Sequence, residues 1–177
     1  VVAECARHGV QVAAVTKVMQ AHPALLRALA ALPSSIRPEL AVVGAGPQEK
    51  DLRRHADTLG LAAGTRFLGR VPPADLPGLY QMAHVFAYPS EAEGFGIPIL
   101  EALYSRVPVI TSTGSCFREA GGDAALYAPP GDVPALTEVL ERAVTDKSLR
   151  RDMVEKGVAH AENFRIEKTS ARLMDIY

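Results

Sequence analysis

The sequence predicts an α/β fold: a Rossmann-like, doubly wound parallel sheet of about six strands with helices on both faces, forming a single domain over residues 1–177. Short apolar segments alternate along the chain with longer segments whose apolar residues recur at helical spacing, which is the pattern of repeated βαβ units. A chain of 177 residues, 48% of them hydrophobic, is also long enough to bury the core of one such domain. We find no internal repeat, low-complexity tract or linker that would divide it.

The elements follow one another in the order that this fold requires. Strands are predicted from their short apolar runs at residues 10–15, 39–43, 66–68, 84–88, 107–111 and 124–127. Helices are predicted from residue 22, over 48–59, over 73–83 with a disturbance at 77–78, from residue 97, after residue 132, over 146–161 and over 166–177. Asp132 is typical of an N-cap, with Pro134 just inside its helix. Strands that alternate with helices indicate a parallel sheet covered on both faces.

Composition excludes several classes of protein. There are 19 Lys and Arg residues against 20 Asp and Glu, with no basic run, so we expect no nucleic-acid partner. Cys5 and Cys116 are far apart and the five histidines show no ligand spacing, so no metal site is predicted and both cysteines are interpreted as small buried side chains. The isolated cysteines favour the reducing cytoplasm as location. No signal peptide and no apolar run of ~20 residues is found in the sequence.

The most informative stretch is 87–101, AYPSEAEGFGIPILE, which runs from a strand through a turn into a helix. Gly94 and Gly96 permit backbone geometries, or a close approach to a ligand, that a Cβ would obstruct. The free N–H groups at a helix start form an anion site. Glu93 and Glu101 bracket the turn, with carboxyl groups on the order of 10 Å apart at ~1.5 Å per helical residue. This layout suits a ligand with a phosphate between two hydroxyl-bearing parts, such as a nucleotide sugar.

The run EGFGIPILEA resembles the E-x7-E signature of the group 1 (family four) retaining glycosyltransferases. The resemblance extends over FLGRV at 67–71 and over the segments that flank the turn, from about residue 24 to residue 177. It implies the C-terminal, donor-binding half of a GT-B enzyme that transfers a hexose from a UDP-, GDP- or ADP-sugar with retention of configuration. It also implies metal independence, no cofactor and a missing N-terminal acceptor domain through which peripheral membrane contact is possible. Because the chain begins with valine, we expect it to be a fragment.

The resemblance also implies roles for individual residues. Glu93 matches the glutamate that contacts the donor sugar, and Glu101 matches the one that binds the ribose hydroxyls. The turn between them would lie at the diphosphate and the sugar through Gly94 and the N–H groups of Phe95, Gly96 and Ile97. The backbone of Arg70 and Val71 would meet the edge of the nucleobase.

The first 23 residues depart from the family pattern. Met19, Gln20 and Ala21 stand where the family places Arg, Lys and Asn, before the helix that starts at residue 22. Loss of those charge-assisted contacts with the diphosphate, each worth roughly 1.5–3 kcal/mol, would slow transfer. A catalytically inactive nucleotide-sugar-binding or scaffolding domain is therefore an alternative, and a GT-B sugar-nucleotide epimerase is a weaker one. The sequence disfavours an NAD site, because Glu49 replaces the third glycine of the dinucleotide fingerprint after Gly44 and Gly46.

Overall fold

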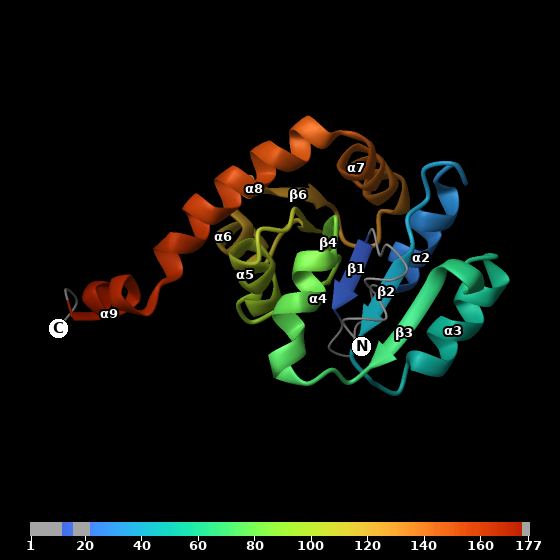
Figure 1. Cartoon of the computed structure of the whole chain (residues 1–177), viewed down its shortest axis with the longest axis horizontal. Coiled ribbons are helices and arrows are strands. Elements are labelled where there is room, and N and C mark those ends of the chain that lie inside the picture. Colours follow the sequence, from blue (N-terminus) through green and yellow to red (C-terminus); the bar gives the residue numbers. More distant parts are fainter. Residues whose placement is uncertain (1–11, 16–21, 175–177) are drawn as a thin grey trace.

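The computed structural model describes residues 12–15 and 22–174, and the fold and site are built from these. Six parallel strands form one sheet in the order β3-β2-β1-β4-β5-β6 (Figure 1). The strands are β1 (Val12–Val15), β2 (Leu40–Val43), β3 (Thr65–Gly69), β4 (Val85–Tyr88), β5 (Val109–Ser112) and β6 (Ala125–Ala128). The predicted doubly wound parallel sheet is confirmed.

Helices cover both faces of this sheet (Figure 1). The α-helices are α2 (His22–Ala31), α3 (Glu49–Thr58), α4 (Leu76–Met82), α5 (Ile97–Tyr104), α6 (Phe117–Gly121), α7 (Val133–Thr145), α8 (Lys147–Ala161) and α9 (Ile166–Met174). Short 3-10 turns are η1 (Ala62–Gly64), η2 (Pro73–Asp75), η3 (Gly122–Ala124) and η4 (Glu162–Phe164). Asp132 caps α7 by accepting a hydrogen bond from the Ala135 N–H, as its position in the sequence predicts.

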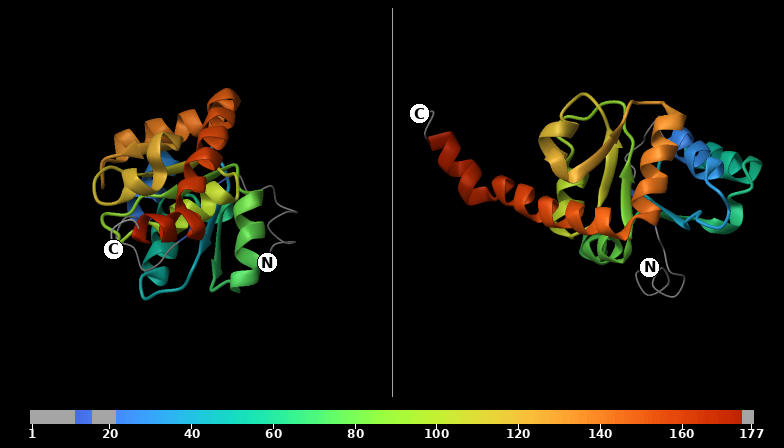
Figure 2. Two further views of the ribbon diagram at one scale, coloured as in Figure 1. Left: turned by 90° about the vertical axis from the view of Figure 1, so that its left-hand side faces the viewer. Right: turned by 90° about the horizontal axis from the view of Figure 1, so that it is seen from above.

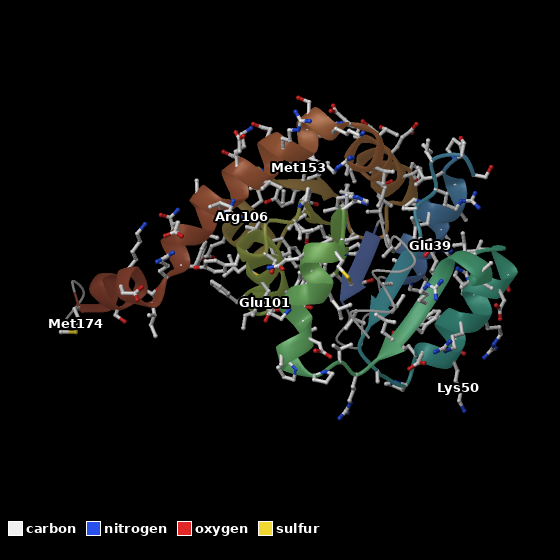
Figure 3. The ribbon with its side chains drawn as sticks, in the orientation of Figure 1. Glu39, Lys50, Glu101, Arg106, Met153 and Met174 are labelled. Atoms are coloured by element: carbon white, nitrogen blue, oxygen red, sulfur yellow. The ribbon has the colours of Figure 1, made fainter. Side chains whose placement is uncertain are left out.

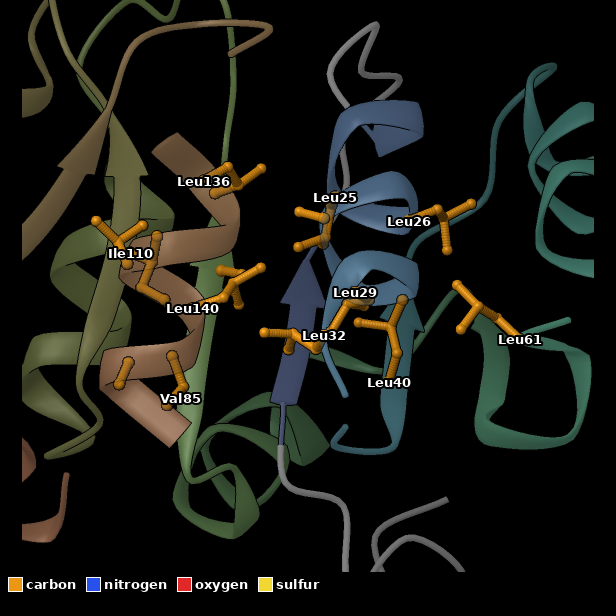
Figure 4. Packing of buried hydrophobic residues seen from close by; sticks show 14 of the residues in the cluster. Leu25, Leu26, Leu29, Leu32, Leu40, Leu61, Val85, Ile110, Leu136 and Leu140 are labelled. Atoms are coloured by element: carbon orange, nitrogen blue, oxygen red, sulfur yellow. The ribbon is translucent and has the colours of Figure 1, made fainter. Parts of the chain in front are cut away.

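The two faces of β4 belong to different cores because successive strand residues point to opposite sides. Val85 and Ala87 join the cluster formed with α2, α3 and α7, whereas Phe86 and Tyr88 join the cluster formed with α4, α5 and α6. All four residues are almost fully buried, which explains why a central strand of a parallel sheet reads as continuously apolar. Leucines of α2 and α7 face each other across the first cluster (Figure 4).

Two of the differences from the predicted boundaries have identifiable reasons. β5 starts at Val109 rather than 107, because Pro108 has no N–H to add to the ladder. The break expected at 77–78 lies before Leu76 instead, since Pro77 falls in the first turn of α4, where a missing N–H costs nothing. β1 is described from Val12, and residues 10–11 and 175–177 of the predicted elements lie outside the described residues.

The C-terminal part of the chain leaves the body of the domain. Helix α8 runs along one side of the molecule, and α9 projects beyond it (Figures 1 and 2). Ile166 and Met174, at the two ends of α9, are 76% and 75% exposed.

Candidate functional site

The turn between β4 and α5 lies where the strand order of the sheet reverses. β4 pairs with β1 on one side and with β5 on the other, so its carboxyl end faces the topological switch point of the sheet. Ligands of open α/β sheets bind outside the carboxyl ends of strands at such a point. The predicted turn therefore sits at the position where this fold forms binding sites.

Glu93 is fixed both by its side chain and by its backbone. The Tyr88 hydroxyl donates to Glu93 Oε1 over 2.7 Å, and the Ser90 hydroxyl lies 3.2 Å from the same oxygen. The Glu93 carbonyl accepts hydrogen bonds from the Ser115 hydroxyl at 3.1 Å and from the Cys116 thiol at 3.4 Å. These contacts hold the carboxylate in one place at the mouth of the turn.

The loop that holds Glu93 has an unusual backbone. Ser115 has φ +46°, one of two non-glycine residues with positive φ in the described part of the chain. Left-handed backbone is unfavourable for a side chain with a Cβ and recurs at functional sites. Cys116 is half-buried rather than buried as predicted, because its sulfur is directed to the Glu93 carbonyl at the surface of the loop. Cys5 lies outside the described residues.

Glu101 lies one turn inside α5, on the side of the helix that faces α4 (Figure 3). The Tyr80 hydroxyl donates to Glu101 Oε2 over 3.0 Å. Together they line a cavity of about 430 Å³ between α4 and α5, with Pro73, Leu76, Pro77, Gln81, Tyr104 and Ser105. Glu93 is not among the residues that line this cavity. The two carboxylates are therefore held by different side chains, Glu101 by Tyr80 and Glu93 by Tyr88.

A row of buried aromatic rings lies beneath both carboxylates. The Tyr80 and Phe86 ring centroids are 5.1 Å apart at 77°, and those of Phe86 and Tyr88 are 5.8 Å apart at 18°. Burial, reinforced by the Glu101 carboxylate, raises the pKa of the Tyr80 phenol above 10.0. Burial and the hydrogen bond with Glu93 raise the pKa of Tyr88 in the same way. Both phenols therefore stay protonated and donate to the carboxylates.

The two glycines of the turn differ in what they do. Gly96 is the N-cap of α5 with φ +87°, and a Cβ there would lie 3.2 Å from Ile99 Cδ1 and 3.3 Å from Ala120 Cβ. A Cβ on Gly94 would meet nothing within 4 Å. Gly96 is thus required by the fold, whereas Gly94 leaves open space above the turn.

The start of α5 is open to a ligand on its polar side. No side chain caps the helix, its first turn contains no acidic residue, and Pro98 follows Ile97 in that turn. The side chains of Phe95 and Ile97 are 38% and 60% exposed. The Phe95 ring packs edge-on against Phe164 of η4 at 5.8 Å, which connects the turn to the end of α8.

Arg70 and Val71 follow the carboxyl end of β3, at the same edge of the sheet as the turn. Three strand spacings separate β3 from β4, which is about 14 Å across the sheet. Arg70 is exposed, whereas the Val71 side chain packs against the cluster of Ala41, Val43 and Leu79. The backbone predicted to contact the base therefore lies beyond the carboxyl end of the outer strand β3, three strands away from the turn that carries Glu93.

Several residues of this site have no signal in the sequence. Tyr80 precedes Glu101 by 21 positions and lies on another helix, and Ser115 and Cys116 reach Glu93 from the loop after β5. Tyr88 ends an apolar strand and is indistinguishable there from a core residue. The segment 16–21, which contains Met19, Gln20 and Ala21, lies outside the described residues.

The part of the chain that the structure describes has neither a cluster of metal ligands nor a membrane-spanning helix. No group of three or more His, Cys, Asp or Glu side chains with metal-binding geometry occurs over 12–15 and 22–174. Within the same residues, every helix is too short or too polar to cross a lipid bilayer.

Residues 10–160 match the family described as glycosyl transferases group 1, and the chain belongs to that family. It is 42% identical over 112 residues to the O-antigen chain mannosyltransferase B of Escherichia coli, covering 63% of this chain and 29% of the relative. It is 35% identical over 163 residues to a D-inositol 3-phosphate glycosyltransferase of Corynebacterium jeikeium, covering 86% and 39%. The chain thus spans less than half the length of these relatives.

Solved structures have the same fold at low sequence identity. The Anabaena protein HepE, crystallised with UDP and glucose, superposes with a TM-score of 0.84 at 22% identity, covering 99% of this chain and 50% of that one. The C-terminal domain of the group 1 glycosyl transferase LpcC from Francisella tularensis gives 0.74 at 20% identity, covering 88% and 87%. The chain therefore has the Rossmann-like fold of a group 1 glycosyltransferase C-terminal domain.

Proposed function

We propose that this chain is the donor-binding half of a GT-B glycosyltransferase that transfers a hexose from a nucleoside diphosphate sugar to an acceptor with retention of configuration. The observation that carries the proposal is the fixed Glu93 carboxylate at the open start of α5, at the switch point of the sheet. Family membership supports sugar transfer as the reaction. The acceptor site would be supplied by a preceding domain, and the compartment would be the cytoplasm.

The diphosphate would lie against the backbone of the turn. The N–H groups of Phe95, Gly96 and Ile97 form the donors there, and the dipole of α5 adds positive potential at the same end. The open space above Gly94 lets a phosphate approach the backbone. These fixed dipoles stabilise the charge that develops on the leaving nucleoside diphosphate as the C1–O bond breaks.

Glu93 would accept hydrogen bonds from hydroxyls of the donor sugar through Oε2, since Oε1 is engaged by Tyr88. The nucleophile is the acceptor hydroxyl: its oxygen forms the new bond to C1 on the face that the leaving group vacates, and its proton passes to the departing diphosphate oxygen. Glu93 is held by four side chains, so it acts as a positioned contact for the sugar. A metal ion is not part of the proposed mechanism.

The nucleoside would run from the turn toward β3. Glu101 would bind the ribose hydroxyls, and the Arg70–Val71 backbone would meet the base at the far end of the edge. HepE was crystallised with UDP and glucose, which makes UDP-glucose the first donor to test. The names of the sequence relatives include a mannosyltransferase, so GDP-mannose is the second.

The test is calorimetric titration of the chain with UDP-glucose, GDP-mannose and ADP-glucose. Glu101→Gln should weaken the tightest of these at least tenfold, because a charge-assisted hydrogen bond contributes roughly 1.5–3 kcal/mol. The control is Glu138→Gln, a matched change of an exposed glutamate on α7. Unchanged affinity in Glu101→Gln would refute the assigned site.

We expect no turnover by this chain alone, and measurable transfer would contradict the need for a second domain.

A nucleotide-sugar-binding domain without transfer activity is the second candidate. Met19, Gln20 and Ala21 favour it, because no cation stands there to neutralise the diphosphate. The double substitution Met19→Arg and Gln20→Lys distinguishes the two candidate functions. A higher affinity for UDP in this variant would show that the missing basic pair weakens donor binding. If the affinity does not change, the substituted residues do not face the diphosphate.

A further inference from the structure

A second cavity lies at the amino ends of the strands, whereas the turn between β4 and α5 lies at their carboxyl ends. Its volume is about 570 Å³, within the range of small-molecule sites. Its lining comes from residues before β4, from residues before β5 and from the first three turns of α8, namely Ala83, His84, Arg106, Pro108, Lys147, Arg150, Arg151, Val154 and Glu155. The amino ends of β4 and β5 meet there, so this cavity is separate from the site at their carboxyl ends.

The cavity concentrates positive charge on a chain whose net charge is −1. Arg106, Lys147, Arg150 and Arg151 line it, with Glu155 as the one acidic residue. Arg150 donates to the carbonyls of α7 that it caps, at 2.7 and 2.6 Å. Within the described residues, none of the ion pairs involves the other three cations. Three cations without an ion-pair partner among the described residues thus line one cavity, against the single acid Glu155.

Arg106 occupies a backbone position that favours glycine. It follows α5 with φ +61°, and its N–H donates to the Leu103 carbonyl while the Val107 N–H donates to Ala102, each at 3.0 Å. This is a Schellman motif, whose left-handed residue is usually glycine because a Cβ is unfavourable there. The fold alone therefore gives no reason for an arginine at this position.

The cavity has two energetically unfavourable features: the left-handed backbone of Arg106 and the cations at the start of α8. Lys147, Arg150 and Arg151 lie in its first two turns, and the first turn has no acidic residue. Cations at the positive end of a helix dipole are destabilising. Asp146 offsets part of this by accepting from the N–H groups of Ser148 and Leu149, both at 2.9 Å. Since Asp146 engages those N–H groups, an anion in the cavity would be held by side chains.

We infer that this cavity binds a phosphate-bearing ligand through Arg106, Lys147 and Arg151. A phosphate compensates both features at once: it pairs with the guanidinium that the left-handed backbone directs into the cavity, and it neutralises the cations at the start of α8. Arginine presents paired N–H groups that match phosphate oxygens. His84 is exposed and lines the same cavity. The inference is independent of the donor site.

The test is a titration of the ¹⁵N-labelled chain with inorganic phosphate at constant ionic strength, followed by two-dimensional NMR. Amide signals of Arg106 and Arg151 should shift and saturate, while those of Gly94 and Phe95 report the donor site separately in the same spectra. Arg106→Gly removes the guanidinium and relieves the backbone, so it should raise the melting temperature and weaken phosphate binding at least tenfold. The control is Arg142→Gln, an exposed arginine on α7 that is outside the cavity.

A second arm identifies the source of the phosphate. Co-sedimentation with phosphatidylglycerol vesicles, compared with phosphatidylcholine vesicles, should detect a lipid headgroup if that is the ligand, and Arg106→Gly should abolish it. Saturable phosphate binding without vesicle binding assigns a soluble ligand instead. Absence of saturable shifts at Arg106 and Arg151, or equal phosphate affinity in Arg106→Gly and the unsubstituted chain, would overturn the inference. Because the signals of Gly94 and Phe95 report the donor site separately, the result for the basic cavity neither supports nor refutes the proposed donor site.

Discussion

The two glycines of the turn provide a test that separates folding from ligand binding. Gly96→Ala places a Cβ at φ +87° and brings it within 3.3 Å of two side chains. Left-handed backbone costs roughly 1–2 kcal/mol in a residue with a Cβ, and the close contacts add to it. We therefore expect Gly96→Ala to lower the free energy of unfolding by about 1–3 kcal/mol.

Gly94→Ala should behave in the opposite way. The new Cβ meets nothing within 4 Å, and Gly94 is not among the glycines with positive φ, so the free energy of unfolding should change by less than about 0.5 kcal/mol. If the turn approaches a diphosphate, however, the Cβ occupies the space of the ligand. Losing one charge-assisted N–H contact costs roughly 1.5–3 kcal/mol, which is about a tenfold to 150-fold rise in Kd.

The assay pairs urea denaturation with calorimetric titration of the nucleotide sugar that binds best. A stable Gly94→Ala variant with weakened donor binding would support a ligand above the turn. A stable variant with unchanged affinity would refute the reasoning, because the space above Gly94 would then have no role in binding.

Three further predictions concern the buried tyrosines. Tyr88→Phe removes the hydroxyl that fixes Glu93 and should lower kcat of the complete enzyme at least tenfold with little change in nucleotide affinity, as measured by steady-state kinetics and by calorimetry with UDP. Tyr80→Phe should weaken nucleotide binding by calorimetry and leave Glu93 in place, because its hydroxyl holds Glu101. Burial raises both phenol pKa values, so the stability they contribute is present below pH 10 and is lost above it, as the unfolded chain begins to release these protons first. Urea denaturation between pH 9 and 11 should show this decline, and it should be shallower in the double Phe variant.

Much of the fold follows from the sequence because its periodicities are local. The strand β4 and the helix α7 were each predicted correctly from their own short segment, β4 from its apolar run and α7 from the spacing of its apolar residues. The turn after β4 is also local, since two glycines and a proline specify where a strand ends and a helix begins. The separation of Glu93 and Glu101, expected at about 10 Å, stays a prediction.

The residues that hold the site could not be found in this way. Tyr80 meets Glu101, and Ser115 meets Glu93, across separations of 21 and 22 positions. Such contacts depend on how α4 and the loop after β5 pack against the turn, and no periodicity in the sequence encodes that packing. The basic cavity has the same origin, because Arg106 and Arg151 are 45 positions apart.

The sequence by itself determined the order of strands and helices, the turn of Gly94 and Gly96 and the two acids that flank it, because each is a property of a short segment. Tertiary structure alone decided which tyrosine supports which acid and where the unpaired cations gather. The reason is that β4, whose residues alternate between two cores, directs Tyr88 toward the α5 side and Val85 toward the other. Only the folded sheet brings those directions together with helices from distant parts of the chain.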